Sequence, residues 1–395
     1  MSDTWIDIDL DVIVSNYQEV VSRLRTGSQC MAVVKADAYG LGAVQVSLAL
    51  AEAGCTAFAV TTVKEGLHLR KYGINGDILV LGPVSTEDVK DAILQNLQLT
   101  VSDFEMLELL EQFGSELSLA VNTHIKLETG MGRTGFLSQD LDKLTVCLRE
   151  SSYIKPVGIY THFARAAQRD KAYNSIQYER FNNGVEKLEA SGISIPFKHV
   201  CNSAAFLDYP EWHLDLVRIG TLLIGHYPGP GFKRELKLRD PWVAKTKLVQ
   251  IRDVPSGTYV GYQSTYKTKN ATRLGVIPVG YSDGIGVEPH LTPQGFFDLL
   301  KIMLKNTALL FGVQLGREKM QINGQPVRLA GKIGMQLTVL DLGRVACQRG
   351  DEVIIPLRRT TANPRIVRRY WREGRIFSIR SIQEGFLPLH PECSN

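Results

Sequence analysis

The sequence lacks a long hydrophobic run, a closely spaced cysteine pair and a strong net charge of either sign. No apolar run reaches the about eighteen residues that a membrane-spanning helix needs. A net charge of +4 on 395 residues gives no support to a nucleic-acid coat. The first residues, MSDTWIDIDLD, are acidic and lack the basic and then apolar order of a secretory signal. We therefore expect a cytoplasmic protein that binds neither membranes nor nucleic acids.

The cysteines form no C-x-x-C pair and no cluster with histidine at zinc spacing, so we expect reduced thiols and no metal site. Cys30 and Cys201 lie beside apolar, strand-like segments, where a free cysteine is usually a small buried hydrophobe. The six are Cys30, Cys55, Cys147, Cys201, Cys347 and Cys393.

The length and the alternation of apolar runs predict two domains, the first an α/β domain. The chain is 44% hydrophobic and longer than a single core usually supports. Short apolar runs alternate with segments whose apolar residues recur at helical spacing, such as 11–24, 43–53 and 103–112. Eight such units predict a (β/α)8 TIM barrel. The predicted strands are 31–34, 57–60, 78–81, 99–101, 124–127, 157–160, 198–201 and 216–219.

Beyond residue 225 the pattern changes to successive strand-like runs separated by glycine-rich turns, which predicts a mostly β C-terminal domain. We expect a barrel over 10–230 and a second domain formed by 1–9 and 231–395. Residues 5–8 alternate like a strand, and we expect them to pair with this second domain. An insertion over 286–316, of unassigned purpose, carries a helical stretch at 294–305. The predicted strands are 244–251, 272–279, 326–329, 337–340 and 351–355.

Polar residues follow the barrel strands, where a barrel of this kind carries its catalytic groups. Lys35 directly follows four apolar residues, and desolvation there favours a neutral amine able to form a Schiff base. A lysine whose stem is buried at a strand end is the structural alternative. Gly40-Leu41-Gly42 lacks the third glycine of a dinucleotide fingerprint. Exposed amides beside Ser203 and Thr221 suit a phosphate.

Several motifs together resemble those of the alanine racemase family. Residues 32–40, AVVKADAYG, are similar to the family's cofactor-lysine signature. Others follow in the family's order: KLETGMGR at 126–133, YTHF at 160–163, NSA at 202–204, VRIG at 217–220, VGYSDG at 279–284 and GKIGM at 331–335. The resemblance covers nearly the whole chain. It implies pyridoxal 5'-phosphate as cofactor, a homodimer and a role in supplying D-alanine as a cell-wall precursor.

The resemblance also implies which residues catalyse the reaction. Lys35 resembles the residue that binds the cofactor covalently and acts as a base on one face of the substrate carbon. Tyr281 of the partner subunit resembles the base on the opposite face. A racemase needs this pair, because a proton removed from one face must be replaceable from the other. For Tyr281 taken alone, an ordinary packing tyrosine is the alternative.

Arg218 resembles the residue that faces the pyridine nitrogen of the cofactor. An arginine donates there without protonating the ring, which weakens the electron sink and disfavours side reactions such as transamination. His162 resembles a residue that supports Arg218. The remaining positions that resemble cofactor-binding residues, chiefly those for the phosphate, are Tyr39, Asn202, Ser203, Gly220, Thr221 and Tyr370.

Two further positions resemble residues that bind the substrate carboxylate, and one resembles a modified lysine. Arg133 matches the residue that contacts both the cofactor's phenolic oxygen and the substrate. Met335 matches a residue whose backbone amide comes from the partner chain. Lys126 matches a position that is often carbamylated in the family, and a plain barrel lysine is the alternative.

Some residues depart from the family pattern and leave the substrate open. Gln336 and Gly334 flank Met335 where the family commonly has aspartate and cysteine, and Lys332 stands where arginine is common. Ala167 replaces an acid near the substrate entrance, which changes the local potential that draws in charged substrates. Alanine is the expected substrate, with serine or a larger amino acid as alternatives. Two other hypotheses are a basic amino-acid decarboxylase and a homologue that binds the cofactor but has lost catalytic activity.

A basic run lies between residues 358 and 375. An RNA-binding patch is one interpretation, but no stacking-aromatic motif accompanies the run. We favour a solvated or dimer-facing loop of the β domain. The run consists of Arg358, Arg359, Arg365, Arg368, Arg369, Arg372 and Arg375.

Overall fold

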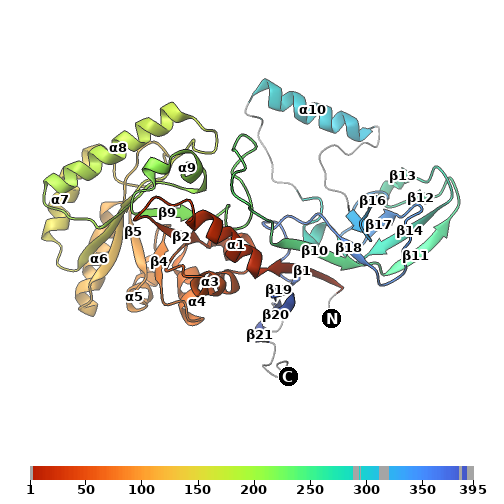
Figure 1. Ribbon diagram of the computed structural model, residues 1–395, viewed down its shortest axis with the longest axis horizontal. Coiled ribbons are helices and arrows are strands. Elements are labelled where there is room, and N and C mark those ends of the chain that lie inside the picture. Colours follow the sequence, from red (N-terminus) through yellow and green to blue (C-terminus); the bar gives the residue numbers. More distant parts are fainter. Residues whose placement is uncertain (1–2, 288–292, 294, 311–319, 382–384, 389–395) are drawn as a thin grey trace. The chain divides into compact units, whose positions relative to one another are not determined.

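The computed structural model describes residues 3–287, 293, 295–310, 320–381 and 385–388 (Figure 1). The chain divides into two compact units. The barrel unit spans 9–241, and the β unit combines 1–8 with 242–395. The predicted fold class, a barrel followed by a mostly β domain, is confirmed.

The barrel unit contains a single parallel sheet of eight strands, nearly closed into a ring. The backbone amide of Asp215 donates to the carbonyl of Lys198 at 3.1 Å, and that of Arg218 donates to Cys201 at 2.9 Å, across the last gap. All eight predicted strands are confirmed. In sheet order they are β8 (Phe197–His199), β7 (Ile154–Tyr160), β6 (Val121–Lys126), β5 (Gln98–Val101), β4 (Asp77–Val80), β3 (Ala57–Val60), β2 (Gln29–Val33) and β9 (Leu216–Ile219).

Helices alternate with the barrel strands, and several of them start at capping side chains. Asp9 caps the first helix by accepting from the amide of Val12 at 3.0 Å, and Asp103 accepts from Met106 at 2.8 Å. These side chains satisfy amides that have no partner inside a helix. The helices are α1 (Leu10–Val21), α2 (Lys35–Tyr39), α3 (Ala43–Glu52), α4 (Val63–Lys71), α5 (Thr86–Leu94), α6 (Phe104–Leu117), α7 (Leu141–Glu150), α8 (Lys171–Ala190) and α9 (Ser203–Asp208).

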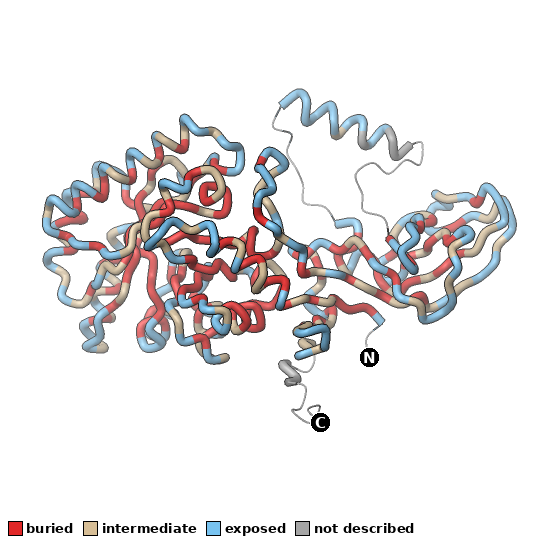
Figure 2. The backbone as a smooth tube through the Cα atoms, in the orientation of Figure 1, coloured by how far each residue is buried: buried red, intermediate tan, exposed pale blue. Residues whose placement is uncertain are grey.

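The barrel strands are buried along nearly their whole length, as Figure 2 shows in red. Every residue of β3, β5 and β9 is buried. Strands covered on both faces read as unbroken apolar runs, which is why the short runs in the sequence predicted them correctly.

The barrel unit extends to Pro241, beyond the predicted limit of 230. Asn16 of α1 explains the difference, because its side chain binds both backbone groups of Arg239. Its Nδ2 donates to the carbonyl at 2.8 Å, and its Oδ1 accepts from the amide at 2.9 Å. The change in periodicity near 225 therefore marks the end of barrel strands, and the chain leaves the barrel unit later.

The β unit is built on an antiparallel sheet of eleven strands. As predicted, the N-terminal strand β1 (Thr4–Asp9) pairs with this unit, antiparallel to β10 (Trp242–Lys247). The predicted strand 244–251 is two strands, because Leu248 and Val249 change partners to Asp351 and Val276 before β11 (Gln250–Val254). The others in the sheet are β14 (Thr272–Ile277), β15 (Met320–Ile322), β16 (Gln325–Leu329), β17 (Thr338–Asp341), β18 (Glu352–Ile354), β19 (Val367–Arg372), β20 (Arg375–Ser381) and β21 (Gly385–Pro388).

The predicted helical insertion contains α10 (Phe296–Leu310), and residues 288–292, 294 and 311–316 of it lie outside the described residues. Phe296 and Phe297 are 74% and 78% exposed, and Figure 2 draws the helix mostly pale blue.

Cys30 and Cys201 are buried, as predicted, while Cys393 lies outside the described residues. Across the described part of the chain, no helix is both long and apolar enough to cross a membrane.

Candidate active site

The chain after β2 makes a left-handed turn immediately behind Lys35. Residues Ala36 to Tyr39 have φ angles between 50° and 57°, a region that side chains other than glycine rarely adopt. The carboxylate of Glu65 accepts from the amide of Ala36 at 2.6 Å, and that of Asp37 accepts from Ala43 at 2.9 Å. These bonds hold the strained turn and fix the backbone from which the Lys35 side chain extends.

Arg218 lies in β9, and four hydrogen bonds to the protein hold its guanidinium. Its Nη1 donates to the His199 carbonyl at 2.9 Å and meets His199 Nδ1 at 2.8 Å. Its Nη2 donates to the carbonyls of Thr161 at 2.7 Å and Val200 at 3.2 Å. Four of the five guanidinium N–H groups are thus used within the described part of the chain, which leaves Nε–H for a further acceptor.

Two buried histidines extend the series of hydrogen bonds that begins at Arg218. His199 Nε2 lies 2.8 Å from His124 Nδ1, and His124 Nε2 lies 2.9 Å from Gln98 Oε1. Because Arg218 can only donate and the Gln98 oxygen can only accept, each imidazole accepts on Nδ1 and donates from Nε2. Burial, and then the charge of Arg218, lower the pKa of His124 to about 3 and that of His199 well below its usual value.

The guanidinium therefore has no carboxylate partner among its hydrogen bonds, and both imidazoles beside it are neutral. Burial lowers the pKa of Arg218 to about 10, so the group stays positively charged near neutral pH. Its Cζ lies 5.0 Å from the centre of the buried Tyr160 ring, which also stacks on His199. The site thus carries a fixed, buried positive charge.

Lys126, at the end of β6, is 3% exposed and lies among positive charges. Its Nζ donates to Thr134 Oγ1 at 2.6 Å. Burial, followed by the charges of Arg133 and Arg218, lowers the pKa of Lys126 to about 8. A large fraction of this lysine is therefore neutral and nucleophilic at mildly alkaline pH.

The loop that carries Arg133 is wound around the carboxylate of Glu128. Its Oε1 accepts from the amides of Gly130 and Met131, each at 2.6 Å, and its Oε2 accepts from Arg133 at 3.2 Å. These bonds lower the pKa of Glu128 despite its partial burial. The side chain of Arg133 extends from this loop and is exposed.

Gly220 and Thr221, which follow Arg218 in the sequence, form a cradle together with Tyr39 and Ser203. A Cβ on Gly220 would lie 2.1 Å from the Tyr39 hydroxyl, so a larger residue at this position would displace the Tyr39 side chain. The Gly220 amide donates to Ser203 Oγ at 3.1 Å. Thr221 Oγ1 is buried and makes no hydrogen bond within the described residues. Such hydroxyls around a glycine backbone are suited to a phosphate.

In the β unit, backbone bonds join the VGYSDG and GKIGM motifs. The amides of Tyr281 and Ser282 donate to the carbonyls of Gly334 at 3.0 Å and Met335 at 3.1 Å. A Cβ on Gly280 would lie 2.2 Å from the Gly334 oxygen, so this close approach also requires glycine. The side chains of Tyr281 and Met335 remain 49% and 57% exposed.

Comparison with known proteins identifies the family. The family models for the N-terminal and C-terminal domains of alanine racemase match residues 8–228 and 242–366. The chain belongs to the alanine racemase family. An alanine racemase from Carboxydothermus hydrogenoformans is 39% identical over 285 residues, which cover 72% of this chain and 77% of that one.

Two further relatives extend over almost the full length. An alanine racemase from Clostridium tetani is 33% identical, with 95% of this chain and 97% of that one covered. The solved structure of an alanine racemase from Clostridium difficile has a TM-score of 0.85 at 28% identity, and covers 96% of this chain and 99% of that one. The alanine racemase fold is therefore shared over both units.

The predicted site residues of this family member fall into two groups. Lys35, Tyr39, Lys126, Arg133, His162, Asn202, Ser203, Arg218, Gly220 and Thr221 belong to the barrel unit, whereas Tyr281, Met335 and Tyr370 belong to the β unit. Tyr370 is fully buried in β19, which has a register shift between Tyr370 and Trp371. Its role in phosphate binding stays a prediction.

The geometry adds detail at two of the predicted positions, whose roles stay predictions. His199 and three carbonyls hold Arg218, and no hydrogen bond within the described residues joins Arg218 to His162. His162 is neutral, because burial and the nearby charge of Arg218 lower its pKa to about 3. Asn202 caps α9, because its side-chain Oδ1 accepts from the backbone amides of Ala204 and Ala205, each at 3.0 Å. In its side chain, only Nδ2 is then left for a cofactor.

The sequence prediction missed the residues that position the others, namely Glu65, Gln98, His124, Glu128 and His199. His124 lies in β6 and His199 ends β8, and each follows another polar residue, Thr123 or Lys198, so no local pattern in the sequence singles them out. The residues that depart from the family pattern at Lys332, Gln336 and Ala167 are all exposed. Their effect on substrate choice remains a prediction.

Proposed function

We propose that the chain is a pyridoxal 5'-phosphate-dependent racemase that interconverts L- and D-alanine as a homodimer. The observation that carries this proposal is the buried guanidinium of Arg218, which lies next to the neutral imidazole of His199 and has one uncommitted N–H. Its strand β9 pairs with β2, the strand that leads to Lys35. A decarboxylase, in which an acidic residue protonates the pyridine ring of the cofactor, would need a carboxylate at the position of Arg218.

The barrel residues fit the cofactor on two counts. The cradle of Tyr39, Ser203, Gly220 and Thr221 offers hydroxyls at a point where a Cβ would not fit, and one of these hydroxyls is buried without a partner among the described residues. Phosphate oxygens accept hydrogen bonds from such groups. The Nε–H of Arg218 can donate to a ring nitrogen without transferring its proton.

The cofactor, when bound, supplies delocalisation of the negative charge that develops on the substrate Cα. Lys35 takes or returns the proton on one face of Cα. Tyr281 of the partner subunit does so on the opposite face. Two bases on opposite faces are required because the reaction must run in both directions through the same site.

Arg218 sets the outcome of the reaction by keeping its own proton. By donating a hydrogen bond and keeping its proton, Arg218 would leave the ring nitrogen of the bound cofactor unprotonated, which would weaken the cofactor as an electron sink. Negative charge stays near Cα, where Lys35 or Tyr281 of the partner subunit can reprotonate it. This arrangement favours racemisation over decarboxylation, for which a protonated ring is the better sink.

The substrate carboxylate is held by Arg133 and by the backbone amide of Met335 of the partner subunit. Lys126 orients Arg133 once its nitrogen is carbamylated, because the new carboxylate is a stronger partner for a guanidinium than an amine. The lowered pKa of Lys126, about 8, supports this modification, since carbon dioxide reacts with the neutral amine.

Mixing two inactive variants tests the shared active site. Lys35→Ala and Tyr281→Phe chains, each nearly inactive alone, are unfolded together and refolded as mixed dimers. A symmetric dimer with shared sites then recovers about a quarter of wild-type activity, because half the dimers are mixed and each has one intact site. No recovery in a mixture shown to contain mixed dimers would place both bases in one chain.

A panel of amino acids in deuterated water tests the substrate. We expect deuterium at Cα of both enantiomers of alanine, read by chiral chromatography and mass spectrometry. Faster exchange of serine or a larger amino acid would reassign the substrate. Carbon dioxide release would identify a decarboxylase, and cofactor binding without any exchange would identify a homologue that has lost turnover.

A further inference from the structure

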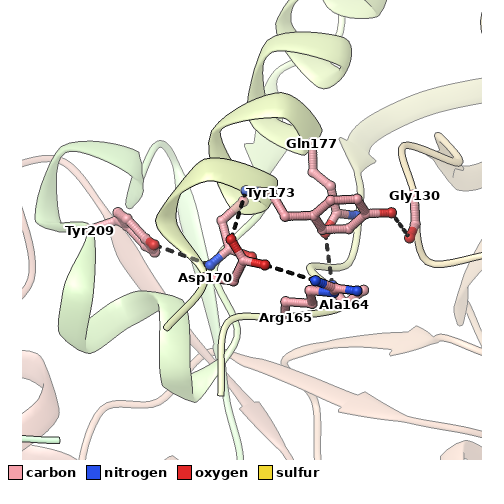
Figure 3. Close-up of polar contacts among 8 residues, drawn as sticks. Gly130, Ala164, Arg165, Asp170, Tyr173, Gln177 and Tyr209 are labelled. Carbon is pink, nitrogen blue, oxygen red and sulfur yellow. Dashed lines mark hydrogen bonds and ion pairs between the residues drawn. The ribbon is translucent and has the colours of Figure 1, made fainter. Parts of the chain in front are cut away.

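Helix α8 contacts two catalytic loops through one buried amide. Gln177 is fully buried, and its Nε2 donates to Thr129 Oγ1 at 3.2 Å and to the carbonyl of His162 at 3.3 Å. Its Oε1 accepts from the amide of Ala164 at 2.9 Å (Figure 3). Thr129 lies in the loop after β6, and His162 and Ala164 lie in the loop after β7. A single side chain therefore joins both loops.

The hydrogen bonds beyond Gln177 have one direction. Thr161 Oγ1 donates its only hydrogen to the carbonyl of Leu127 at 2.9 Å. In its 2.7 Å contact with Thr129 Oγ1, Thr161 must then accept, and Thr129 donates. Thr129 in turn accepts from Gln177. Thr129 and Thr161 are 2% and 1% exposed, so this series of hydrogen bonds is shielded from water, and both hydroxyls have partners.

The same helix supports the loop of Arg133 at two more points. Tyr173 donates its hydroxyl to the carbonyl of Gly130 at 2.8 Å (Figure 3), and Arg180 Nη1 donates to the carbonyl of Thr129 at 2.9 Å. A Cβ on Gly130 would lie 2.6 Å from the Tyr173 hydroxyl. The loop thus lies directly against α8, and Glu128 holds it from within.

The chain of hydrogen bonds also reaches Arg218. The backbone carbonyl of Thr161, whose hydroxyl belongs to the chain, accepts from Arg218 Nη2 at 2.7 Å. A displacement of Thr161 would therefore alter one of the four bonds that cage the guanidinium.

We propose that Gln177 is a positioning residue. It holds the loop after β6, which carries Arg133, the loop after β7, which carries His162, and the hydrogen-bond partners of Arg218 in one fixed arrangement. The proposal rests on the proposed function, in which Arg133 binds the substrate carboxylate. Gln177 acts only through these loops. A small displacement of a substrate-binding group is sufficient to cost about a hundredfold in rate.

The test replaces Gln177 by Met, which keeps the length of the side chain and removes every hydrogen bond. We expect kcat/KM for alanine to fall by about tenfold to a hundredfold. Amide hydrogen exchange should accelerate in peptides covering 127–136 and 161–165. Tyr173→Phe removes a single hydrogen bond and should give a smaller change in the same direction, confined to the first peptide.

Asn174→Leu provides the matched control. Asn174 is also a fully buried amide on α8, but its Nδ2 donates to the hydroxyl of Tyr209 at 3.1 Å, away from both loops. This variant should leave exchange in the two loop peptides at the wild-type rate. Equal acceleration in Asn174→Leu and Gln177→Met would overturn the proposal, since any loss of a buried amide would then loosen the helix.

A double-mutant cycle separates positioning from general stability. In an Arg133→Ala background, Gln177→Met should lower kcat/KM by a clearly smaller factor than in the wild-type background, because one of the groups that it positions is gone. The same drop in both backgrounds, or unchanged loop exchange in Gln177→Met, would overturn the inference. Loop exchange is measurable whether or not the wild-type protein racemises alanine, so failure of the proposed function remains a separate result.

Discussion

The two groups of site residues differ in how far the chain itself encloses them. Arg218 is 4% exposed, and the barrel unit provides partners for four of its five N–H groups. In the β unit, the backbone of Tyr281 and Met335 is fixed by hydrogen bonds, yet their side chains are about half exposed. The barrel unit thus encloses its own site residue, whereas the β-unit residues combine a hydrogen-bonded backbone with uncovered side chains.

Lys35→Ala should have the largest effect. We expect activity to fall by about ten-thousandfold or more, because the variant loses both the covalent attachment of the cofactor and one base. Mass spectrometry after borohydride reduction should find the cofactor on the wild-type peptide containing Lys35 and on no peptide of the variant. Attachment at a different lysine would contradict the assignment. Lys64→Ala, an exposed lysine of α4, is the control.

Tyr281→Phe should slow proton abstraction from one enantiomer of alanine by about a hundredfold or more, and abstraction from the other enantiomer by less. Its free energy of unfolding should stay within about 0.5 kcal/mol of wild type, as for other exposed positions. Isotope exchange from each enantiomer and urea titration measure the two effects. Equal, unimpaired rates in both directions would remove Tyr281 from the mechanism and end the contrast between the units.

The barrel unit should lose stability in acid because it holds neutral histidines. The pKa values of His124 and His162 are lowered to about 3, against a usual 6.5. Between these values the unfolded chain binds protons that the native chain does not, so the free energy of unfolding falls as the pH falls from 6.5 towards 3. Urea titrations across this range should show it, and His124→Phe should reduce the slope. A pH-independent stability would contradict the neutral state.

Lys126 should give the smallest effect. Its pKa of about 8 predicts that bicarbonate raises carbamylation and activity by a few-fold at pH 9, where the amine is neutral, and less at pH 7, where it is mostly charged. Intact mass in bicarbonate buffer and steady-state rates provide the measurement. Lys126→Met should abolish the response, and a response that survives in this variant would assign it to another group.

The barrel could be predicted from sequence because each of its strands is a short apolar run between helical segments. The β unit was harder to predict. Leu248 and Val249 read as the middle of one strand, but they mark the point where the chain changes partners between β10 and β11. The barrel's true end depends on a contact between Asn16 and Arg239, distant in sequence, which no local pattern contains.

For the site, the sequence places reactive groups at strand ends but does not reveal what holds them. Lys35 and Arg218 were found by position and resemblance. His199, which contacts Arg218, lies within its strand, and Gln177 lies on a helix one turn from other polar residues. The choice between such residues depends on three-dimensional contacts, which a single sequence does not contain.

The left-handed turn behind Lys35 restricts which amino acids these positions can accept. Proline cannot adopt a positive φ, and β-branched side chains do so only at high energy. Glycine would relieve the strain at Ala36 or Ala38 but would enlarge the freedom of the unfolded chain. A saturation library over 36–39 should therefore be depleted of valine, isoleucine, threonine and proline even among variants that bind no substrate.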